Sequence, residues 1–227
     1  MKNIDINTIV KNIIIITIPI ITFVWLTILN SENLTVLLIV LGVLSCLPLI
    51  LKFIKSTYNK NKLLLILIML AICIASRFIL VGTTQFNPVT AIIIITGIYC
   101  GSEAGLLVGG LTPLITNIHY LQGVWTPFQM IIWGAIGFFA GVLYKKIKDN
   151  KVMLCAYGVF SGIVFSLFMD LWYVYWCNNA FNFEIYMTNI STLLPFMAKY
   201  ILSNIVFLLL IDVIFSDKLE KLRLNTA

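Results

Sequence analysis

The chain has 227 residues, of which 61% are hydrophobic and 11% charged, and its formal net charge is +6. Soluble domains average about 45–50% apolar and about 25% charged residues, so a soluble fold could not bury this much apolar surface. The basic residues lie mostly in short segments between apolar stretches, as in a membrane protein, and not on a nucleic-acid-binding face. We therefore expect an all-α integral membrane protein that does not bind nucleic acid.

Apolar stretches long enough to cross a bilayer follow one another along the chain. A hydrocarbon core of about 30 Å needs roughly 20 apolar residues per helix. The stretch from Asn87 to Ile118 would be about 48 Å long as one helix, so we expect it to turn back at Gly101, with Ser102 capping the next helix. The sequence thus predicts about eight transmembrane helices, near residues 9–29, 34–54, 62–81, two within 87–118, 125–144, 152–177 and 193–216.

The distribution of basic residues predicts the orientation. With the N-terminus in the cytoplasm, thirteen of the fifteen Lys and Arg residues lie on the cytoplasmic side, and the outer loops contain Glu32 and Glu184 but no basic residue. This asymmetry follows the positive-inside rule. Only Arg77 and Lys199 fall within helices, both toward the outer ends. We expect a multi-pass protein of the cell (plasma) membrane, surrounded by lipid, with both termini in the cytoplasm.

Several patterns that predict enzymes and metal sites are missing from the sequence. The five cysteines form no CxxC pair, and there is a single histidine, so we expect neither a structural disulfide nor a metal site. The sequence contains no GxxxxGK[ST] loop, no HExxH and no convincing Ser/His/Asp spacing. We therefore expect no catalytic residue and no cofactor, and an active transporter built from this chain would take its energy from another one.

Asp170 and Lys199 are charged residues at membrane depth, where each needs a partner or a function. Both are predicted in the outer third of adjacent antiparallel helices, so their side chains would lie at matching depth. One interpretation is an internal ion pair that fixes the register of the two helices. The other is a polar wall of a binding pocket, and one pair could serve both purposes.

Trp125, Gln129 and Trp133 follow one another at a spacing of four residues, starting at the outer surface. This spacing places all three on one helix face. Two indoles beside an amide suit a flat or amide-bearing organic ligand. The alternatives are an interfacial aromatic belt, a packing role for Trp133, and a capping box closed by Gln129.

Small residues predict close contacts between helices. Such residues recur every three or four positions at Gly97–Gly109 and at Gly134–Gly141, where we expect a structural role. Ala71 and Ala75 form a similar small-xxx-small face on the helix predicted at 62–81. That face packs either inside the protein or against a partner subunit.

Taken together, several strings resemble one family of membrane proteins. They are Ala71-Ile-Cys-Ile-Ala-Ser-Arg77, Phe86-Asn-Pro-Val-Thr-Ala-Ile-Ile-Ile-Ile-Thr-Gly97, Gly123-Val-Trp-Thr-Pro-Phe-Gln-Met-Ile-Ile-Trp-Gly134 and Phe165-Ser-Leu-Phe-Met-Asp-Leu-Trp172. With these strings and the Lys-rich C-terminal tail, the chain from about residue 62 onward resembles the S components of energy-coupling factor (ECF) transporters, the vitamin importers of prokaryotes. The last two strings look like the branch associated with cobalamin and related corrinoids.

This resemblance implies a fold, partners and a mechanism. Residues 61–227 would form the six-helix substrate-binding core with its cytoplasmic tail, and residues 1–60 would add two transmembrane helices that the core does not require. Ala71 and Ala75 would dock on a transmembrane coupling subunit, and two ATP-binding-cassette ATPases would supply the energy. The whole S component would then topple and present its pocket to the cytoplasm.

The resemblance also implies where a vitamin would bind. The loops around 82–87, 118–125 and 178–191 would form a lid over the pocket. The candidate substrate-binding residues are Asn117, Trp125, Gln129, Trp133, Asp170 and Lys199.

Two other functions fit some of the same residues. A self-sufficient secondary transporter would couple Asp170 or Glu103 to protons. An intramembrane enzyme acting on a lipid or isoprenoid would use Asp170 and Lys199 as acid and base. A role in assembly or as a scaffold is a further alternative.

Overall fold

The computed structural model describes residues 60–79, 86–120, 125–178 and 181–226, and all the regular elements in these ranges are helices. They are α3 (Lys60–Ile79), α4 (Val89–Cys100), α5 (Ser102–Tyr120), α6 (Trp125–Val142), α7 (Tyr144–Ile147), α8 (Lys151–Asn178) and α9 (Phe183–Thr226). This confirms the all-α prediction for the described residues. The helices predicted at 9–29 and 34–54 lie outside those residues, so the count of about eight stays a prediction.

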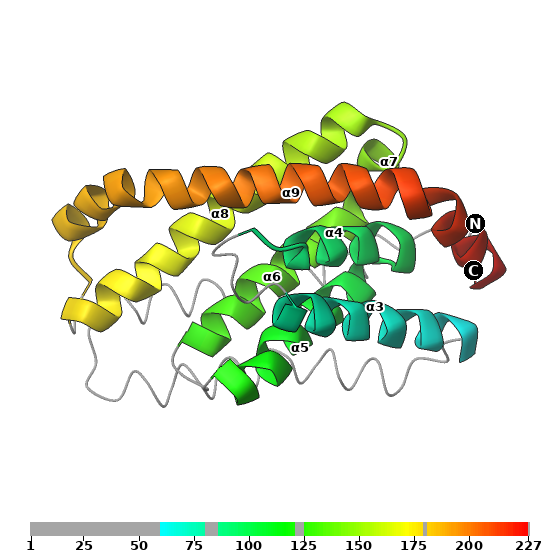
Figure 1. Ribbon diagram of the computed structural model, residues 1–227, viewed down its shortest axis with the longest axis horizontal. Coiled ribbons are helices and arrows are strands. Elements are labelled where there is room, and N and C mark those ends of the chain that lie inside the picture. Colours follow the sequence, from blue (N-terminus) through cyan, green and yellow to red (C-terminus); the bar gives the residue numbers. More distant parts are fainter. Residues whose placement is uncertain (1–59, 80–85, 121–124, 179–180, 227) are drawn as a thin grey trace, which may run out of the picture.

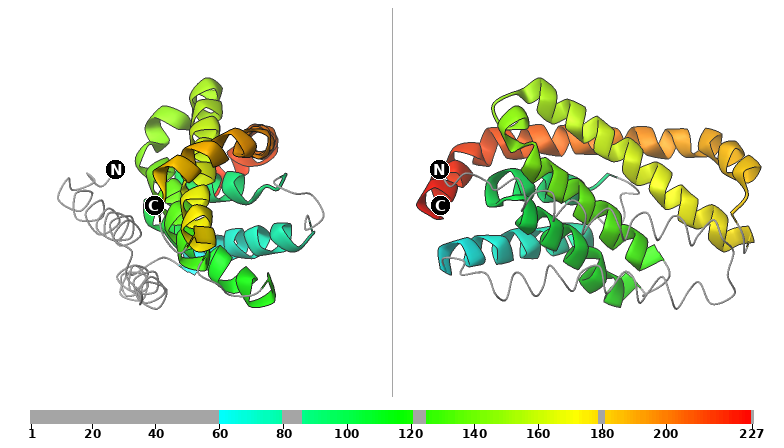
Figure 2. Two further views of the ribbon diagram at one scale, coloured as in Figure 1. Left: turned by 90° about the vertical axis from the view of Figure 1, so that its left-hand side faces the viewer. Right: turned by 180° about the vertical axis from the view of Figure 1, so that it is seen from behind.

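The short helix α4 lies at the centre of the bundle, and all its residues are buried. It lies between α3 and α9, and α5 and α6 also pack against it (Figures 1 and 2). Its sequence is apolar on every side, which is typical of a helix surrounded by others. With 12 residues it is about 18 Å long, so α4 alone is shorter than a hydrocarbon core of about 30 Å.

The predicted turn at Gly101 is confirmed. Helix α4 ends at Cys100, and Gly101 has φ = 101°, a backbone conformation that favours glycine because a Cβ would be strained there. The N–H of Gly101 donates a hydrogen bond to the carbonyl oxygen of Gly97, at 3.1 Å. Helix α5 then begins at Ser102 and returns beside α4.

Glycines bring the backbones of α4, α5 and α6 into direct contact, which confirms the structural role predicted for them. A Cβ added at Gly105 would lie 2.6 Å from the carbonyl carbon of Gly137, and one added at Gly109 would lie 2.5 Å from that of Trp133. In both cases the neighbour is main chain, which cannot move aside as a flexible side chain can. The position of Trp133, and therefore of the polar residues around it, depends on this close approach.

Helix α9 is longer than the predicted helix at 193–216. It has 44 residues, about 66 Å, and extends along the length of the described structure (Figure 1). It begins at Phe183 because the side chain of Asn182 caps it: Asn182 Oδ1 accepts hydrogen bonds from the N–H of Glu184 at 2.9 Å and of Ile185 at 3.1 Å. The expected lid loop at 178–191 is therefore wrong for residues 183–191, which are helical.

In the described part of the chain, four helices are long and apolar enough to cross a membrane. They comprise Asn61–Ile79, Trp125–Val142, Lys151–Asn178 and Phe183–Lys221. These helices are compatible with a membrane protein, as the sequence predicted. The first residues of α3 and the last turns of α9 lie at the same end of the molecule (Figures 1 and 2).

Candidate ligand-binding site

Arg77 lies in the last turn of α3, where its half-buried side chain faces α5 and α6. Its Nη1 donates a hydrogen bond to Thr116 Oγ1 at 2.5 Å, and Nη2 makes a long one of 3.5 Å to Gln129 Oε1. The hydroxyl of Tyr120 donates to the main-chain carbonyl of Arg77 at 3.1 Å, which satisfies a carbonyl at the open end of α3. These two hydrogen bonds hold the guanidinium against neutral acceptors.

Aromatic rings cover the Arg77 guanidinium. Its Cζ lies 5.2 Å from the ring centroid of Trp133 and 5.5 Å from that of Tyr120, both within the range of cation–π contacts. A cation in the last turn of a helix gains about 0.3–1 kcal/mol from the helix dipole. On insertion scales, an Arg at the centre of a membrane helix costs about 2.5–3.5 kcal/mol. The helix dipole alone therefore does not offset the cost of a deeply buried guanidinium.

Trp133 is held in place by hydroxyl groups from two other helices. It is 4% exposed, and its Nε1 donates to Thr90 Oγ1 at 3.0 Å and to Tyr200 Oη at 3.1 Å. The Thr90 and Tyr200 hydroxyls also hydrogen-bond to each other. Phe165 stacks on both large rings, with centroids 5.0 Å from Trp133 and 4.8 Å from Tyr200. The indole has little freedom to move.

Asn117 completes the polar groups around Gln129. It is fully buried, and its Nδ2 donates to Thr126 Oγ1 at 2.8 Å and to Gln129 Oε1 at 3.0 Å. Gln129 Oε1 therefore accepts hydrogen bonds from both Asn117 and Arg77. The Oδ1 atom of Asn117 is buried and has no hydrogen-bond partner among the described residues. Such an acceptor costs free energy until a donor reaches it.

Together these residues form one site, which we call the Arg77 cluster. Its members come from six helices, α3 to α6, α8 and α9, and are Arg77, Thr90, Thr116, Asn117, Gln129, Trp133, Phe165 and Tyr200. The cluster combines a cation, neutral hydrogen-bonding groups and aromatic faces inside an apolar bundle. This chemistry suits binding of a polar organic molecule.

The structure brings three of the six predicted substrate-binding residues together. Asn117, Gln129 and Trp133 belong to the Arg77 cluster, and the Oε1 atom of Gln129 accepts from Asn117 and Arg77 in place of the expected capping contact. Trp125 is half-buried and packs edge-on against Trp172, with centroids 5.7 Å apart. The sequence therefore predicted the α6 face of the site.

Asp170 and Lys199 do not form the predicted ion pair in the described part of the chain. Asp170 is 7% exposed and its Oδ2 is buried without a hydrogen-bond partner, whereas Lys199 is exposed. The next residue, Tyr200, is the one that faces the Arg77 cluster, and neighbouring residues on a helix point about 100° apart. The predicted depth of the two charges did not determine which way Lys199 points.

The sequence analysis did not identify five members of the cluster as site residues: Arg77, Thr90, Thr116, Phe165 and Tyr200. Arg77 had a usable signal, because a charge inside an apolar helix is a functional candidate by itself. The other four are ordinary residues in apolar helices, and no local pattern separates them from residues that only pack.

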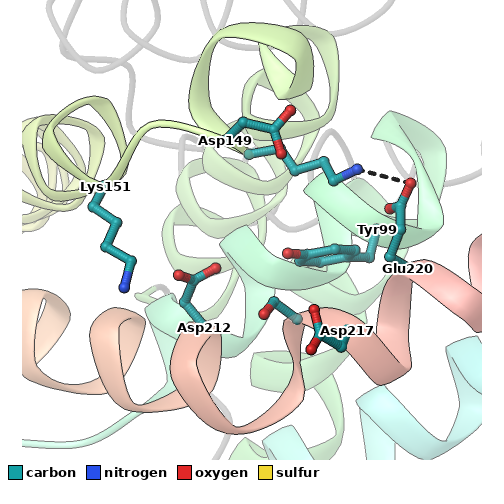
Figure 3. A pocket seen from close by; sticks show the side chains of 8 residues that line it. Tyr99, Asp149, Lys151, Asp212, Asp217 and Glu220 are labelled. Atoms are coloured by element: carbon teal, nitrogen blue, oxygen red, sulfur yellow. Dashed lines mark ion pairs between the residues drawn. The ribbon is translucent and has the colours of Figure 1, made fainter.

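A cavity of about 290 Å³ lies near the other end of α4 (Figure 3). It contains an ion pair between Lys148 Nζ and Glu220 Oε1, at 2.7 Å. Tyr200 and Asp212 are twelve residues apart on α9, about 18 Å, so this cavity is separate from the Arg77 cluster. It is lined by Tyr99, Lys148, Asp149, Lys151, Asp212, Ser216, Asp217 and Glu220.

The fold and the site define a helical protein with membrane-compatible helices and a buried polar and aromatic cluster. The chain belongs to a family described as a family of unknown function (DUF6580), whose model matches residues 57–217. This range contains the whole Arg77 cluster and leaves out the first 56 residues. No curated protein and no solved structure matches the chain significantly.

Proposed function

We propose that this chain is the substrate-binding membrane subunit of an ECF-type transporter that imports a vitamin or a related micronutrient. The observation that carries the proposal is the Arg77 cluster, in which six helices direct polar and aromatic side chains toward one another. Polar groups at membrane depth are costly, so a cluster of polar side chains at one place indicates a function beyond packing. Ligand binding without turnover is the activity that we propose for it.

The exposed face of α3 supports a docking role for this helix. Ala71 and Ala75 are exposed, whereas Cys73 is fully buried and Arg77 faces the cluster. Small exposed residues let a second helix approach closely. Helix α3 would thus contact the coupling subunit with one face and the ligand site with the other. Two ATP-binding-cassette ATPases on separate chains would energise the transport.

The positions of the lysines support a cytoplasmic location for one end of the bundle. Lys148 and Lys151 line the same cavity as the last turns of α9, and the start of α3 lies at that end as well (Figures 1 and 3). By the positive-inside rule this end faces the cytoplasm of the cell membrane. The Arg77 cluster, at the opposite end of α4, would then lie on the outer side, where a substrate first arrives.

The proposed substrate is a corrinoid such as cobalamin. This narrower proposal comes from the strings at 123–134 and 165–172. The amides of Asn117 and Gln129 support it, because amide groups pair well with an amide-bearing ligand.

One observation favours a second candidate function. The buried Oδ2 of Asp170 has no partner among the described residues, and unpaired carboxylates at membrane depth occur in proton-coupled transporters. We therefore propose a self-sufficient proton-coupled transporter as the second candidate function.

The test is mass spectrometry of the small molecules that co-purify with the protein from cells grown in vitamin-rich medium. A corrinoid present at about one molecule per protein would support both the class and the substrate. A different vitamin or precursor would keep the class and exclude the corrinoid proposal. Protein that retains only lipid, and that binds no vitamin when vitamins are added, would contradict the proposed function.

A further inference from the structure

We infer that Arg77 binds an oxyanion of the substrate, a carboxylate or a phosphate. This inference rests on the proposed function, since it names the substrate class for the same site. It follows from the hydrogen bonds of the guanidinium, from the lack of an ion pair between Arg77 and any carboxylate of the described residues, and from the neighbouring acceptor on Asn117.

The guanidinium has more N–H donors than its hydrogen bonds within the protein occupy. Arg carries five N–H donors in a fixed fork that matches a carboxylate or a phosphate. The structure gives two of its hydrogen bonds to neutral oxygens, those of Thr116 and Gln129, and the second is long at 3.5 Å. The faces of Trp133 and Tyr120 attract the cation but accept no strong hydrogen bond. The fork thus has unused donors beside rings that hold it in place.

No carboxylate of the described residues forms an ion pair with Arg77. Seven of the nine acidic residues of the chain fall in the described ranges, and the segments that follow α3 and α5 in the sequence, 80–85 and 121–124, contain none. Asp5 and Glu32 are the two acidic residues outside the described ranges. A cation at this depth is stabilised by a negative partner. An anionic group of the ligand is the partner that the geometry points to.

Asn117 adds a complementary group at the same place. Its Oδ1 is buried without a described partner, and its Nδ2 shares the Gln129 Oε1 atom with Arg77. The site therefore offers cationic donors and a neutral acceptor side by side. A ligand with an anionic oxygen and a nearby N–H or O–H donor would satisfy both, and a purely neutral or cationic ligand would not.

The experiment measures thermal stabilisation of the purified full-length protein in detergent by matched pairs of compounds. The carboxylate pair is biotin and biotinamide. The phosphate pairs are riboflavin 5′-phosphate and riboflavin, and cobinamide phosphate and cobinamide, and the members of each pair differ by one phosphate group. We expect an anionic member to bind at least tenfold more tightly than its neutral counterpart, and the pair that responds distinguishes carboxylate from phosphate.

Variants of Arg77 test whether this residue is responsible. Arg77→Gln is expected to lower the affinity for the anionic member at least tenfold more than it lowers the affinity for the neutral member. Arg77→Lys keeps the charge and is expected to retain part of the preference. Glu32→Gln, which removes the acidic residue predicted on the same side of the membrane, is the control and is expected to bind as the wild type does.

Equal binding of both members of every pair by the wild type would overturn the inference without any variant, so the test does not depend on the folding of Arg77→Gln. Unchanged anion binding by Arg77→Gln would also overturn it. Tight binding of a neutral vitamin, indifferent to Arg77, would overturn the inference and leave the proposed function standing. An oxyanion that binds through Arg77 but is converted to a product would support the inference and contradict the proposed function. Absence of any binding would overturn both.

Discussion

The guanidinium of Arg77 lies over the indole of Trp133, with Cζ 5.2 Å from the ring centroid. The same indole donates hydrogen bonds to Thr90 and Tyr200, so the cation from α3 rests on a ring that is fixed to α4 and α9. A displacement of either residue would therefore also shift α4 and α9, which are far apart in sequence. This pair connects the candidate ligand-binding site with the helix that we propose as the docking surface.

Replacing Trp133 by Phe should destabilise the protein and weaken ligand binding. The change removes the Nε1 donor from two buried hydroxyls, at a cost of about 1–3 kcal/mol, and it shrinks the surface under Arg77. Melting curves in detergent, with and without the co-purified ligand, measure both effects. Trp176→Phe is the matched control, because Trp176 is 51% exposed. Equal effects in the two variants would mean that the Trp133 contacts contribute nothing specific.

Replacing Gly109 by Ala should lower the melting temperature by several degrees. The added Cβ would lie 2.5 Å from the carbonyl carbon of Trp133, so α5 and α6 must separate. Overpacking typically costs about 1–3 kcal/mol, and about 1 kcal/mol corresponds to about 2–4 °C for a chain of this size. Gly158→Ala is the control, since its nearest neighbour is the flexible end of Leu208. A melting temperature for Gly109→Ala equal to that of the wild type would show that the two helices are not in such close contact.

Replacing Asp170 by Asn should raise the melting temperature by a few degrees. The carboxylate is 7% exposed and one of its oxygens is buried without a described partner, so the neutral isostere removes a burial cost of about 1–3 kcal/mol. Glu184→Gln, at an exposed position, should change little. A marked fall in the melting temperature for Asp170→Asn would indicate that the carboxylate has a charged partner, and would favour the predicted ion pair with Lys199.

Local chemistry made parts of the fold predictable. Gly101 could be placed at a turn because a continuous helix would have been too long for the membrane and glycine is suited to the required backbone conformation. The spacing of Gln129 and Trp133 placed both on one face of α6, and both belong to the Arg77 cluster. These features depend only on residues that are close in sequence.

Other parts depend on contacts that the sequence does not display. The sequence predicted a helix that starts near 193, whereas the cap at Asn182 extends α9 back to Phe183. Thr90 and Tyr200 are 110 residues apart, and only the packing of α4 against α9 brings their hydroxyls together. Arg77 was placed within its helix, toward the outer end, but not among the candidate site residues, although a cation in an apolar helix needs a partner.

Replacing Ala71 and Ala75 by Leu should lower uptake in cells and leave ligand binding by the purified protein unchanged. Both residues are exposed on α3, so larger side chains fit the isolated protein but would obstruct a closely packed partner helix. Uptake of labelled ligand, measured beside the affinity of the purified variant, separates the two effects. Leu at Ala156 and Ala198, which are exposed on α8 and α9, provides the control. Full uptake by the Ala71 and Ala75 variant would exclude this face as the docking surface.

The most direct test of the proposed function is uptake of the co-purified ligand with and without the ATPase partners. We expect uptake in cells that contain the coupling subunit and active ATPases, and only binding when the ATPases are inactivated. We also expect that liposomes containing this protein alone accumulate no ligand under a pH gradient. Accumulation driven by that gradient, and lost in Asp170→Asn, would exclude the proposed ECF-type subunit and establish a self-sufficient transporter.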